Sequence, residues 1–178
     1  MRYYRKMIGE RLYLSPVSTD DAEKYIKWMN DEAMAVDFNQ YSGVVATKND
    51  LKWLFEPQNG IQRYAIVLLD GDVLIGGIAL QNIDHLSRSA FFGIFIGEEE
   101  HRGKGYGTEA IRLIVHYGFK TLNLNNISLS VHVENHAAIA CYKKVGFKEY
   151  GRRRECWFRN GKYLDAIYMD MLAREFEQ

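Results

Sequence analysis

The glycine-rich segment at residues 98–110, EEEHRGKGYGTEA, combines residue types that suit phosphate binding. Its glycines occupy alternate positions: Gly103, Gly105 and Gly107. They lie between a predicted apolar strand and a predicted helix, where backbone N–H groups without a helical partner and the positive helix end attract anions. Arg102 and Lys104 add positive charge, and we expect the Thr108 hydroxyl to cap the first helical turn. The segment therefore predicts an anion site at a helix N-terminus.

Known phosphate loops differ in their spacing from this segment. A P-loop requires G-x-x-x-x-G-K-[ST], which is missing here. A dinucleotide-binding loop requires G-x-G-x-x-G after a strand of a parallel βαβ unit, whereas here the third glycine comes one residue early and the preceding strands are predicted to be antiparallel. The spacing that remains is Arg102-x-x-Gly105-x-Gly107, and a turn that merely caps a helix is its plain alternative.

The segment NHAAIACYKKVGF, at residues 135–147, carries the second set of chemically useful residues. Offsets of three and seven place Asn135, Ala138 and Tyr142 on one face of a helix. A phenol within hydrogen-bond reach of a leaving thiolate can act as its general acid, so Tyr142 is the candidate acid. The alternatives are structural: Tyr142 as a buried core aromatic, and Asn135 as an N-cap, a role that is compatible with ligand binding.

Alternating and helical periodicities predict the elements that position these segments. Strands are expected at residues 10–17, 63–70, 73–83, 89–97 and 127–133, and helices at residues 20–30, 51–56, from Lys104 or Gly105 onward, and 135–145. Asn160-Gly161 predicts a C-terminal hairpin, Gly146 a helix C-terminus, and Gly93 a bulge or a close backbone approach. Residues 31–46 show no firm period. This order predicts an α/β fold with a mixed, mostly antiparallel sheet and helices on both faces.

Composition narrows the class of protein. The 178 residues predict a single domain, 1–178, and 47% hydrophobic content supplies its core. Lys plus Arg and Asp plus Glu total 23 each, and this zero net charge argues against a dedicated nucleic-acid binder. No apolar run approaches the length of a membrane span, and two cysteines suit a reducing compartment. We therefore expect a cytoplasmic protein without nucleic-acid or membrane partners.

Together the two motifs resemble the GCN5-related N-acetyltransferase (GNAT) superfamily. Within it, the chain is similar to the RimJ/RimL-like branch of ribosomal-protein N-terminal and spermidine acetyltransferases. The similar segments are GIFIGEEEHRGKGYGTEA, YGFKTLNLNNISLSV, ENHAAIACYKKVGF and FRNGKYLDAIYMDML. The resemblance covers nearly the whole chain, and it implies a GNAT fold and the transfer of an acetyl group from acetyl-CoA to a primary amine.

The resemblance also implies positions for the donor. Acetyl-CoA would lie in a splay between strands 89–97 and 127–133, with its pantetheine arm along Ile94, Phe95 and Ile96, and a strand amide near Ile94 would polarise the thioester carbonyl. Its pyrophosphate would bind the backbone of the loop, which consists of Arg102, Gly103, Lys104, Gly105, Tyr106, Gly107 and Thr108. Asn135 would contact the pantetheine and Tyr142 would face the sulfur. No metal is implied.

The chain departs from the family pattern at Phe91, where many relatives carry a glutamate that serves as a water-mediated base. The base therefore stays open between His85, Asp84, Glu134 and a chain of water molecules. We expect direct attack by a primary amine, either a protein N-terminus or a small amine, in a ternary complex, because no nucleophile is well supported. A polyamine acceptor is one alternative, and a non-catalytic acyl-CoA sensor is another. The edges of a small sheet often pair, which suggests a homodimer.

Some charged and ligand-type residues are expected to be solvated. His132, Glu134 and His136 alternate across a predicted strand end, a pattern that fits a solvated strand end better than a metal site. We expect the glutamates at residues 98–100 to point to solvent or toward a cationic amine, since facing inward they would repel a phosphate. Cys141 is predicted to be a packing residue rather than a nucleophile.

Overall fold

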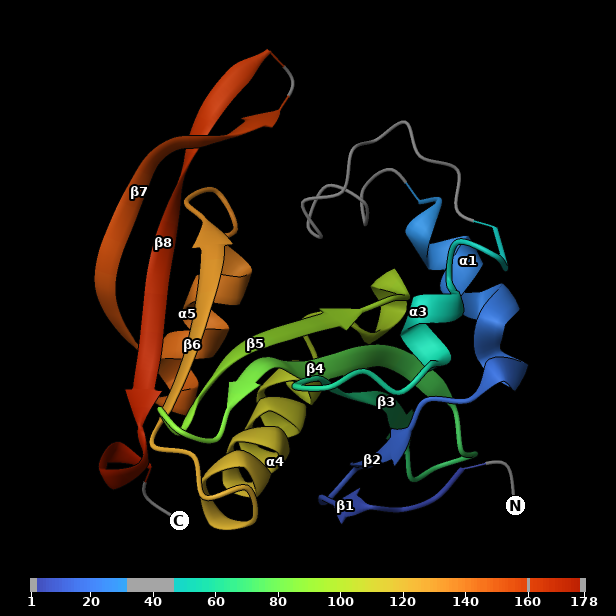
Figure 1. Cartoon of the computed structure of the whole chain (residues 1–178). Coiled ribbons are helices and arrows are strands. Elements are labelled where there is room, and N and C mark those ends of the chain that lie inside the picture. Colours follow the sequence, from blue (N-terminus) through green and yellow to red (C-terminus); the bar gives the residue numbers. More distant parts are fainter. Residues whose placement is uncertain (1–2, 32–46, 160, 177–178) are drawn as a thin grey trace.

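A mixed eight-stranded sheet organises the chain (Figure 1). The computed structural model describes residues 3–31, 47–159 and 161–176. Its strands are β1 (Met7–Ile8), β2 (Leu12–Pro16), β3 (Gln62–Leu68), β4 (Leu74–Asp84), β5 (Ser89–Ile96), β6 (Asn126–His132), β7 (Lys148–Arg159) and β8 (Lys162–Leu172). They lie in the order β1-β2-β3-β4-β5-β6-β8-β7, and every described pair is antiparallel except β5–β6. The predicted mixed, mostly antiparallel α/β sheet is confirmed.

Helices cover both faces of this sheet, as expected. They are α1 (Ala22–Met29), α3 (Lys52–Phe55), α4 (Tyr106–Lys120) and α5 (His136–Val145), with short 3-10 turns at Thr19–Asp21, Glu99–His101 and Ala173–Glu175. One core forms where α4 and α5 pack on the sheet around Ile111, Ile114 and Phe92. A second core lies between the opposite face and α1 with α3, around Trp28 and Leu54. Figure 1 shows α4 below the sheet and α1 and α3 above it.

Several local predictions hold and others are wrong in detail. The β3–β4 and β7–β8 hairpins form, although Asn160 of the second turn lies outside the described residues, as do residues 32–46 of the segment without a firm period. Strand β2 is buried on both faces from Leu12 to Ser15 rather than only at alternate positions, because α1 and α4 lie on opposite sides of it. The 3-10 turn before α1 is capped by the Ser18 hydroxyl, which accepts a hydrogen bond from the Asp20 N–H.

The prediction for Gly93 is also wrong. Gly93 pairs with Ala79 in regular register, and a side chain at Gly93 would meet no crowded neighbour. The bulge between β4 and β5 lies instead between Gln81 and Asp84. Close backbone approach occurs at the other end of β5, where a Cβ on Gly97 would overlap the Trp28 ring. This approach lets α1 pack tightly over the end of β5.

The sheet separates at its centre, between β5 and β6. These strands pair in parallel only where Ser89, Ala90 and Phe91 face Asn126, Ile127 and Ser128. Beyond Phe91 the two strands diverge, which Figure 1 shows as β5 running toward α1 while β6 runs alongside β8. The remaining length of β5 therefore has a strand partner, β4, on one edge only among the described residues. The splay expected from the sequence is present.

Candidate active site

Strand β5 directs its backbone groups and its side chains to different surroundings. The Gly97 N–H, just past the strand, donates to the Ile75 carbonyl of β4 at 2.8 Å. Because backbone groups alternate along a strand, those of Ile94 and Ile96 point the other way, into the splay beside β6. Side chains alternate as well, so Ile94 and Ile96 face α4 and α5, whereas Phe95 faces α1. The strand thus contributes to a site on each of its faces.

The glycine loop leads directly into α4. Gly105 is the N-cap in the left-handed region (φ 84°), and Gly103 also has a positive φ of 71°. Such angles favour glycine because they strain residues that carry a Cβ. No side chain caps the helix, so the N–H groups of its first turn are available to a ligand. The predicted Thr108 cap is wrong: its hydroxyl oxygen lies 3.2 Å from Cys141 Sγ on α5 instead.

Arg102 and Lys104 take different roles. The Arg102 guanidinium donates from Nε to the Ile96 carbonyl and from Nη2 to the Gly97 carbonyl, both at 3.0 Å, and thereby fixes the loop to the end of β5. Lys104 is exposed and does not line the cavity beside the loop, so its side chain does not supply the charge expected there. Its carbonyl accepts a hydrogen bond from Arg11 instead.

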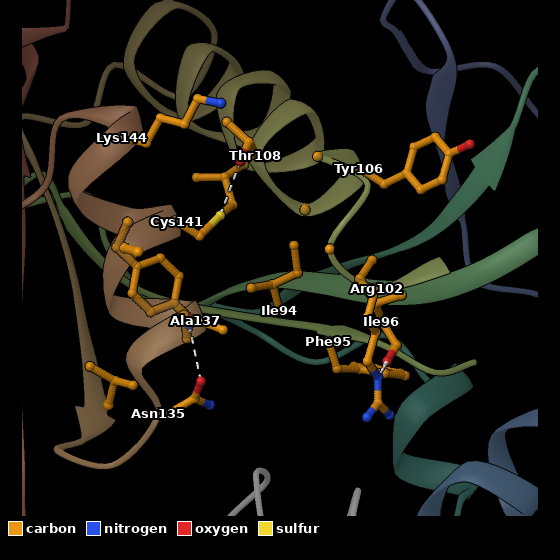
Figure 2. A pocket seen from close by; sticks show the side chains of 18 of the residues that line it. Ile94, Phe95, Ile96, Arg102, Tyr106, Thr108, Asn135, Ala137, Cys141 and Lys144 are labelled. Atoms are coloured by element: carbon orange, nitrogen blue, oxygen red, sulfur yellow. Dashed lines mark hydrogen bonds between the residues drawn. The ribbon is translucent and has the colours of Figure 1, made fainter. Parts of the chain in front are cut away.

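Helix α5 presents the predicted polar face. The Asn135 Oδ1 accepts a hydrogen bond from the Ala138 N–H at 3.0 Å, which confirms Asn135 as the N-cap (Figure 2). Two turns later Tyr142 is 9% exposed, and its ring meets Phe92 and Phe147 at centroid distances of 6.0 and 6.1 Å. Gly146 ends the helix as expected. Tyr142 is therefore largely buried, yet it still lines a cavity.

Two cavities meet within the splay. The first, here called the loop cavity, has a volume of about 610 Å³ and lies between β5, the glycine loop, β6 and α5. All predicted site residues except Lys104 line it: Ile94, Phe95, Ile96, Arg102, Gly103, Gly105, Tyr106, Gly107, Thr108, Asn135 and Tyr142. Figure 2 shows Asn135, Cys141 and Thr108 around it, with β5 crossing behind.

The second cavity lies toward α1 and α3 and has a volume of about 330 Å³; we call it the aromatic cavity. Aromatic side chains dominate its wall: Tyr25, Trp53, Tyr64, Phe91, Phe92, Phe95, Tyr142 and Trp157. Five residues border both cavities, namely Ile94, Phe95, Ser130, Tyr142 and Trp157. A group bound in either cavity can therefore reach Tyr142.

The site includes residues that the sequence analysis did not assign to it. Trp157 on β7 borders both cavities, and Lys144 on α5 lines the loop cavity. His132 was expected to be solvated, but it is 3% exposed, because Trp157 packs against its ring at 5.2 Å between centroids. No local sequence signal predicts this contact between His132 on β6 and Trp157 on β7. None of the three base candidates, Asp84, His85 and Glu134, lines either cavity.

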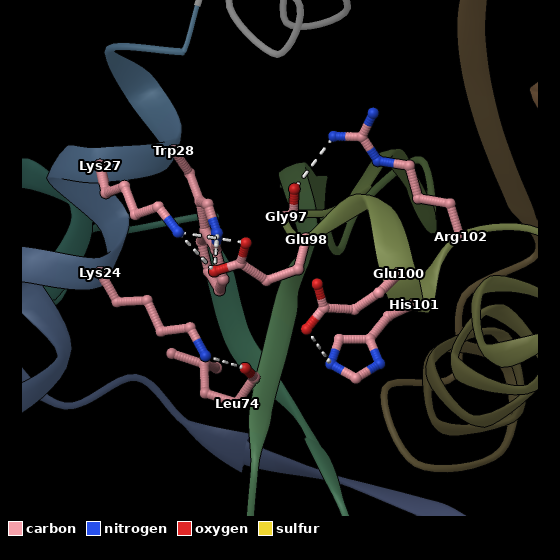
Figure 3. A network of polar contacts seen from close by, with 9 residues as sticks. All are labelled: Lys24, Lys27, Trp28, Leu74, Gly97, Glu98, Glu100, His101 and Arg102. Atoms are coloured by element: carbon pink, nitrogen blue, oxygen red, sulfur yellow. Dashed lines mark hydrogen bonds and ion pairs between the residues drawn. The ribbon is translucent and has the colours of Figure 1, made fainter.

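Glu98 links α1 to the segment before the glycine loop. It was expected to face solvent or a cationic substrate, but its carboxylate accepts hydrogen bonds from Lys27 Nζ at 3.1 Å and from the Trp28 indole at 3.2 Å (Figure 3). Burial raises the pKa of Glu98, but these donors outweigh burial and hold it below its usual range. The adjacent Gly97 carbonyl receives Arg102. The network thus joins α1 to the segment between β5 and the glycine loop.

Among residues 3–31, 47–159 and 161–176, no helix is long and apolar enough to cross a membrane. The same residues contain no cluster of three or more His, Cys, Asp or Glu side chains that could hold a metal ion. Cys141 and Cys156 are free thiols.

A splayed sheet, an uncapped helix N-terminus beside it and a tyrosine that borders two cavities form one continuous site. A family model described as "Acetyltransferase (GNAT) domain" matches residues 11–148. The chain therefore belongs to the GNAT acetyltransferase family, and the family and enzyme class expected from the sequence are confirmed.

Individual relatives agree with this assignment. The chain is 38% identical over 119 residues to YdaF of Bacillus subtilis (strain 168), provisionally named a ribosomal N-acetyltransferase, and 38% identical over 115 residues to the spermidine N(1)-acetyltransferase of Escherichia coli (strain K12). These matches cover 67% and 65% of this chain, and 63% and 61% of the relatives, which is less than two thirds of their length.

A solved structure extends the similarity to nearly the whole chain. The crystal structure of spermidine N-acetyltransferase from Vibrio cholerae in complex with CoA and spermine has a TM-score of 0.85 and 30% sequence identity. The match covers 93% of this chain and 97% of that one. The fold of this chain is therefore the GNAT fold.

Proposed function

We propose that this protein transfers the acetyl group of acetyl-CoA directly to a primary amine, with the donor in the loop cavity and the amine in the aromatic cavity. The observation that carries this proposal is the meeting of the two cavities at Tyr142 and Ile94. An arrangement in which both substrates reach one point favours a ternary complex over a covalent enzyme intermediate. The named relatives, one of them crystallised with CoA, support the choice of donor.

The residues of the loop cavity fit acetyl-CoA. The glycine loop and the first turn of α4 offer N–H groups and a positive helix end to a pyrophosphate. The backbone groups of Ile94, which point into the splay, suit the amides of a pantetheine arm. Lys144 lines the same cavity and adds a positive charge for a phosphate. Asn135 borders the cavity at the α5 end, near where a pantetheine would pass.

The chain contributes three actions to the reaction. Bound acetyl-CoA supplies an acetyl group activated as a thioester. The Ile94 N–H donates a hydrogen bond to the carbonyl oxygen as negative charge develops on it. The aromatic cavity aims the amine nitrogen at the carbonyl carbon, so that a C–N bond forms while the C–S bond breaks. Tyr142 donates its phenolic proton to the departing sulfur, the proton that the amine loses passes to solvent, and solvent returns a proton to the Tyr142 phenolate.

The acceptor alternatives differ in charge. The relatives named as spermidine acetyltransferases support a polyamine, and the relative provisionally named as ribosomal supports a protein N-terminus. Both carry a primary amine, which is the shared requirement of the mechanism. A non-catalytic sensor would bind acetyl-CoA through the same loop without turnover.

The remaining proposals concern the whole protein. We propose that residues 1–178 form a single domain located in the cytoplasm, in keeping with its two free thiols. We further propose a homodimer, since β7 is an edge strand and Phe158 and Tyr163 at the end of its hairpin are 67% and 65% exposed. Sedimentation of the wild type beside a Phe158→Ser variant tests the dimer. A wild type that sediments as a monomer contradicts it.

Initial-rate kinetics test the proposed reaction. Thiol release from acetyl-CoA is followed while both acetyl-CoA and a primary amine are varied, and the protein mass is measured after incubation with acetyl-CoA alone. Direct transfer predicts intersecting double-reciprocal lines and an unchanged protein mass. Parallel lines with an acetylated protein would show a covalent intermediate, and tight binding of acetyl-CoA without release on any amine would establish the sensor.

A further inference from the structure

The aromatic cavity points to a particular class of acceptor. Resting on the proposed function, we propose that the acceptor is a primary amine on an aromatic or otherwise apolar carbon skeleton, and that desolvation, rather than an enzyme base, keeps this amine neutral for attack. The shared chemistry of such acceptors is met by a free arylalkylamine and by a peptide whose N-terminal residue is aromatic.

The shape and lining of the cavity carry the first half of this inference. Aromatic rings reach it from six elements: Tyr25 on α1, Trp53 on α3, Tyr64 on β3, Phe91, Phe92 and Phe95 on β5, Tyr142 on α5, and Trp157 on β7. Tyr25 is 1% exposed, whereas Trp53 is 38% exposed and stands at the mouth. An apolar ring inserted here replaces water against aromatic faces, which is favourable, and edge-to-face contacts add to it.

Charge in the cavity points the same way. Among the lining residues that the structure describes, the formally charged side chain is Arg63, and no carboxylate faces the space. The Arg63 guanidinium lies 5.0 Å from the Trp53 ring centroid and donates to Gln58 Oε1 at 2.9 Å, so it is held in place. Among the described lining residues, the additional ammonium groups of a polyamine would meet the Arg63 cation and no counter-charge. Transfer of such groups from water into this cavity is therefore unfavourable.

The same surroundings favour a neutral amine. The titratable side chains that line the cavity in the described part of the chain are Tyr25 on α1, Arg63 and Tyr64 on β3, and Tyr142 on α5. Burial raises the pKa values of Tyr25 and Tyr64, which shows how strongly this region disfavours charge on a phenol. Burial next to a cation likewise lowers the pKa of a bound ammonium group. An amine that binds in its neutral form needs no base within the cavity before attack.

Acceptor competition tests the substrate class. We would measure kcat/KM from thiol release for 2-phenylethylamine, a peptide with N-terminal Phe, and spermidine. We expect at least a tenfold preference for the better aromatic acceptor over spermidine, and the preferred aromatic acceptor identifies the source. A kcat/KM for spermidine equal to or above both aromatic acceptors overturns this inference and leaves the proposed acetyl transfer intact. Absence of thiol release with every acceptor overturns the proposed function, and this inference with it.

The pH dependence tests the origin of the neutral amine. An alkylamine has a solution pKa of about 10 and a peptide α-amino group one of about 8. If the amine itself titrates, the upper break in log kcat/KM shifts by about two pH units between 2-phenylethylamine and the peptide. If an enzyme base titrates, the break stays at one pH for both acceptors, and the second half of the inference is wrong.

A paired substitution tests the cavity wall. Phe91→Glu introduces a carboxylate into the aromatic cavity, and Phe91→Leu is its uncharged control. We expect the ratio of kcat/KM for spermidine to that for 2-phenylethylamine to rise at least tenfold in Phe91→Glu and less than threefold in Phe91→Leu. Equal ratios in the two variants, with thermal unfolding showing both folded, would contradict control of acceptor choice by charge at this wall.

Discussion

Substitution of Asn135 separates two roles that the structure gives to one side chain. Its Oδ1 caps α5 through the Ala138 N–H at 3.0 Å, and the same residue lines the loop cavity. Asn135→Ala removes both roles, whereas Asn135→Asp keeps an oxygen acceptor at the cap and places a negative charge in the cavity. The pair therefore distinguishes stability from donor binding.

The magnitude follows from the single capping bond. Loss of an N-cap acceptor costs about 1 kcal/mol, which corresponds to a fall in Tm of roughly 2–4 °C for a protein of this size. In Asn135→Asp the carboxylate restores the cap and gains about 0.3–1 kcal/mol from the helix dipole. We therefore expect Asn135→Asp to unfold at or above the wild-type temperature, and Asn135→Ala below it.

Calorimetric unfolding and acetyl-CoA titration form the assay. Donor affinity is expected to rank wild type, then Asn135→Ala, then Asn135→Asp, since an anionic donor is repelled by a carboxylate. This order differs from the order of stability. An Asn135→Ala variant with the wild-type Tm would refute the capping argument, and wild-type acetyl-CoA affinity in Asn135→Asp would refute the assignment of Asn135 to the donor site.

Two further predictions concern the loop and the network beside it. Gly105→Ala puts a Cβ on a residue with a φ of 84°. We therefore expect the free energy of unfolding to fall by about 1–2 kcal/mol and the KM for acetyl-CoA to rise. Gly151→Ala, where a Cβ would meet no neighbour, is the control and should change neither quantity. Glu98→Gln should lower stability by less than about 1 kcal/mol at pH 7, because the pair with Lys27 is partly exposed. Because the folded-state pKa of Glu98 is depressed, this difference should be complete above the ordinary value of 4.5 and be lost as pH falls through the lower folded-state pKa. Urea unfolding at several pH values would show this loss, and a difference unchanged at low pH would contradict the ion pair.

Local signals account for the parts of the fold and site that sequence could predict. The glycine spacing before α4 specifies a loop with positive φ angles, and the structure places them at Gly103 and Gly105. Asn135 caps α5 and Tyr142 follows at an offset of seven, so helical geometry alone puts both on one face. The hairpins could be predicted because alternating apolar residues are also a local signal.

Non-local pairing decided what sequence could not predict. Glu98 meets Lys27 and Trp28, about 70 residues earlier, and nothing in the glutamate run indicates that partner. His132 is buried by Trp157 because β8 pairs with both β6 and β7 and so brings the two residues close together. Lys104 turns outward although its neighbours line the cavity. The aromatic cavity draws rings from elements far apart in the chain, so no window of sequence contains it.

The most direct test of the central claim is thiol release from acetyl-CoA by Tyr142→Phe beside the wild type, at saturating acceptor, with acetyl-CoA affinity measured in parallel. Phe preserves the ring contacts with Phe92 and Phe147 and removes only the phenolic proton donor. We expect a fall in kcat of about 10²- to 10⁴-fold, with acetyl-CoA affinity within threefold of wild type. A kcat within threefold of wild type would show that Tyr142 is not the acid that protonates the leaving sulfur.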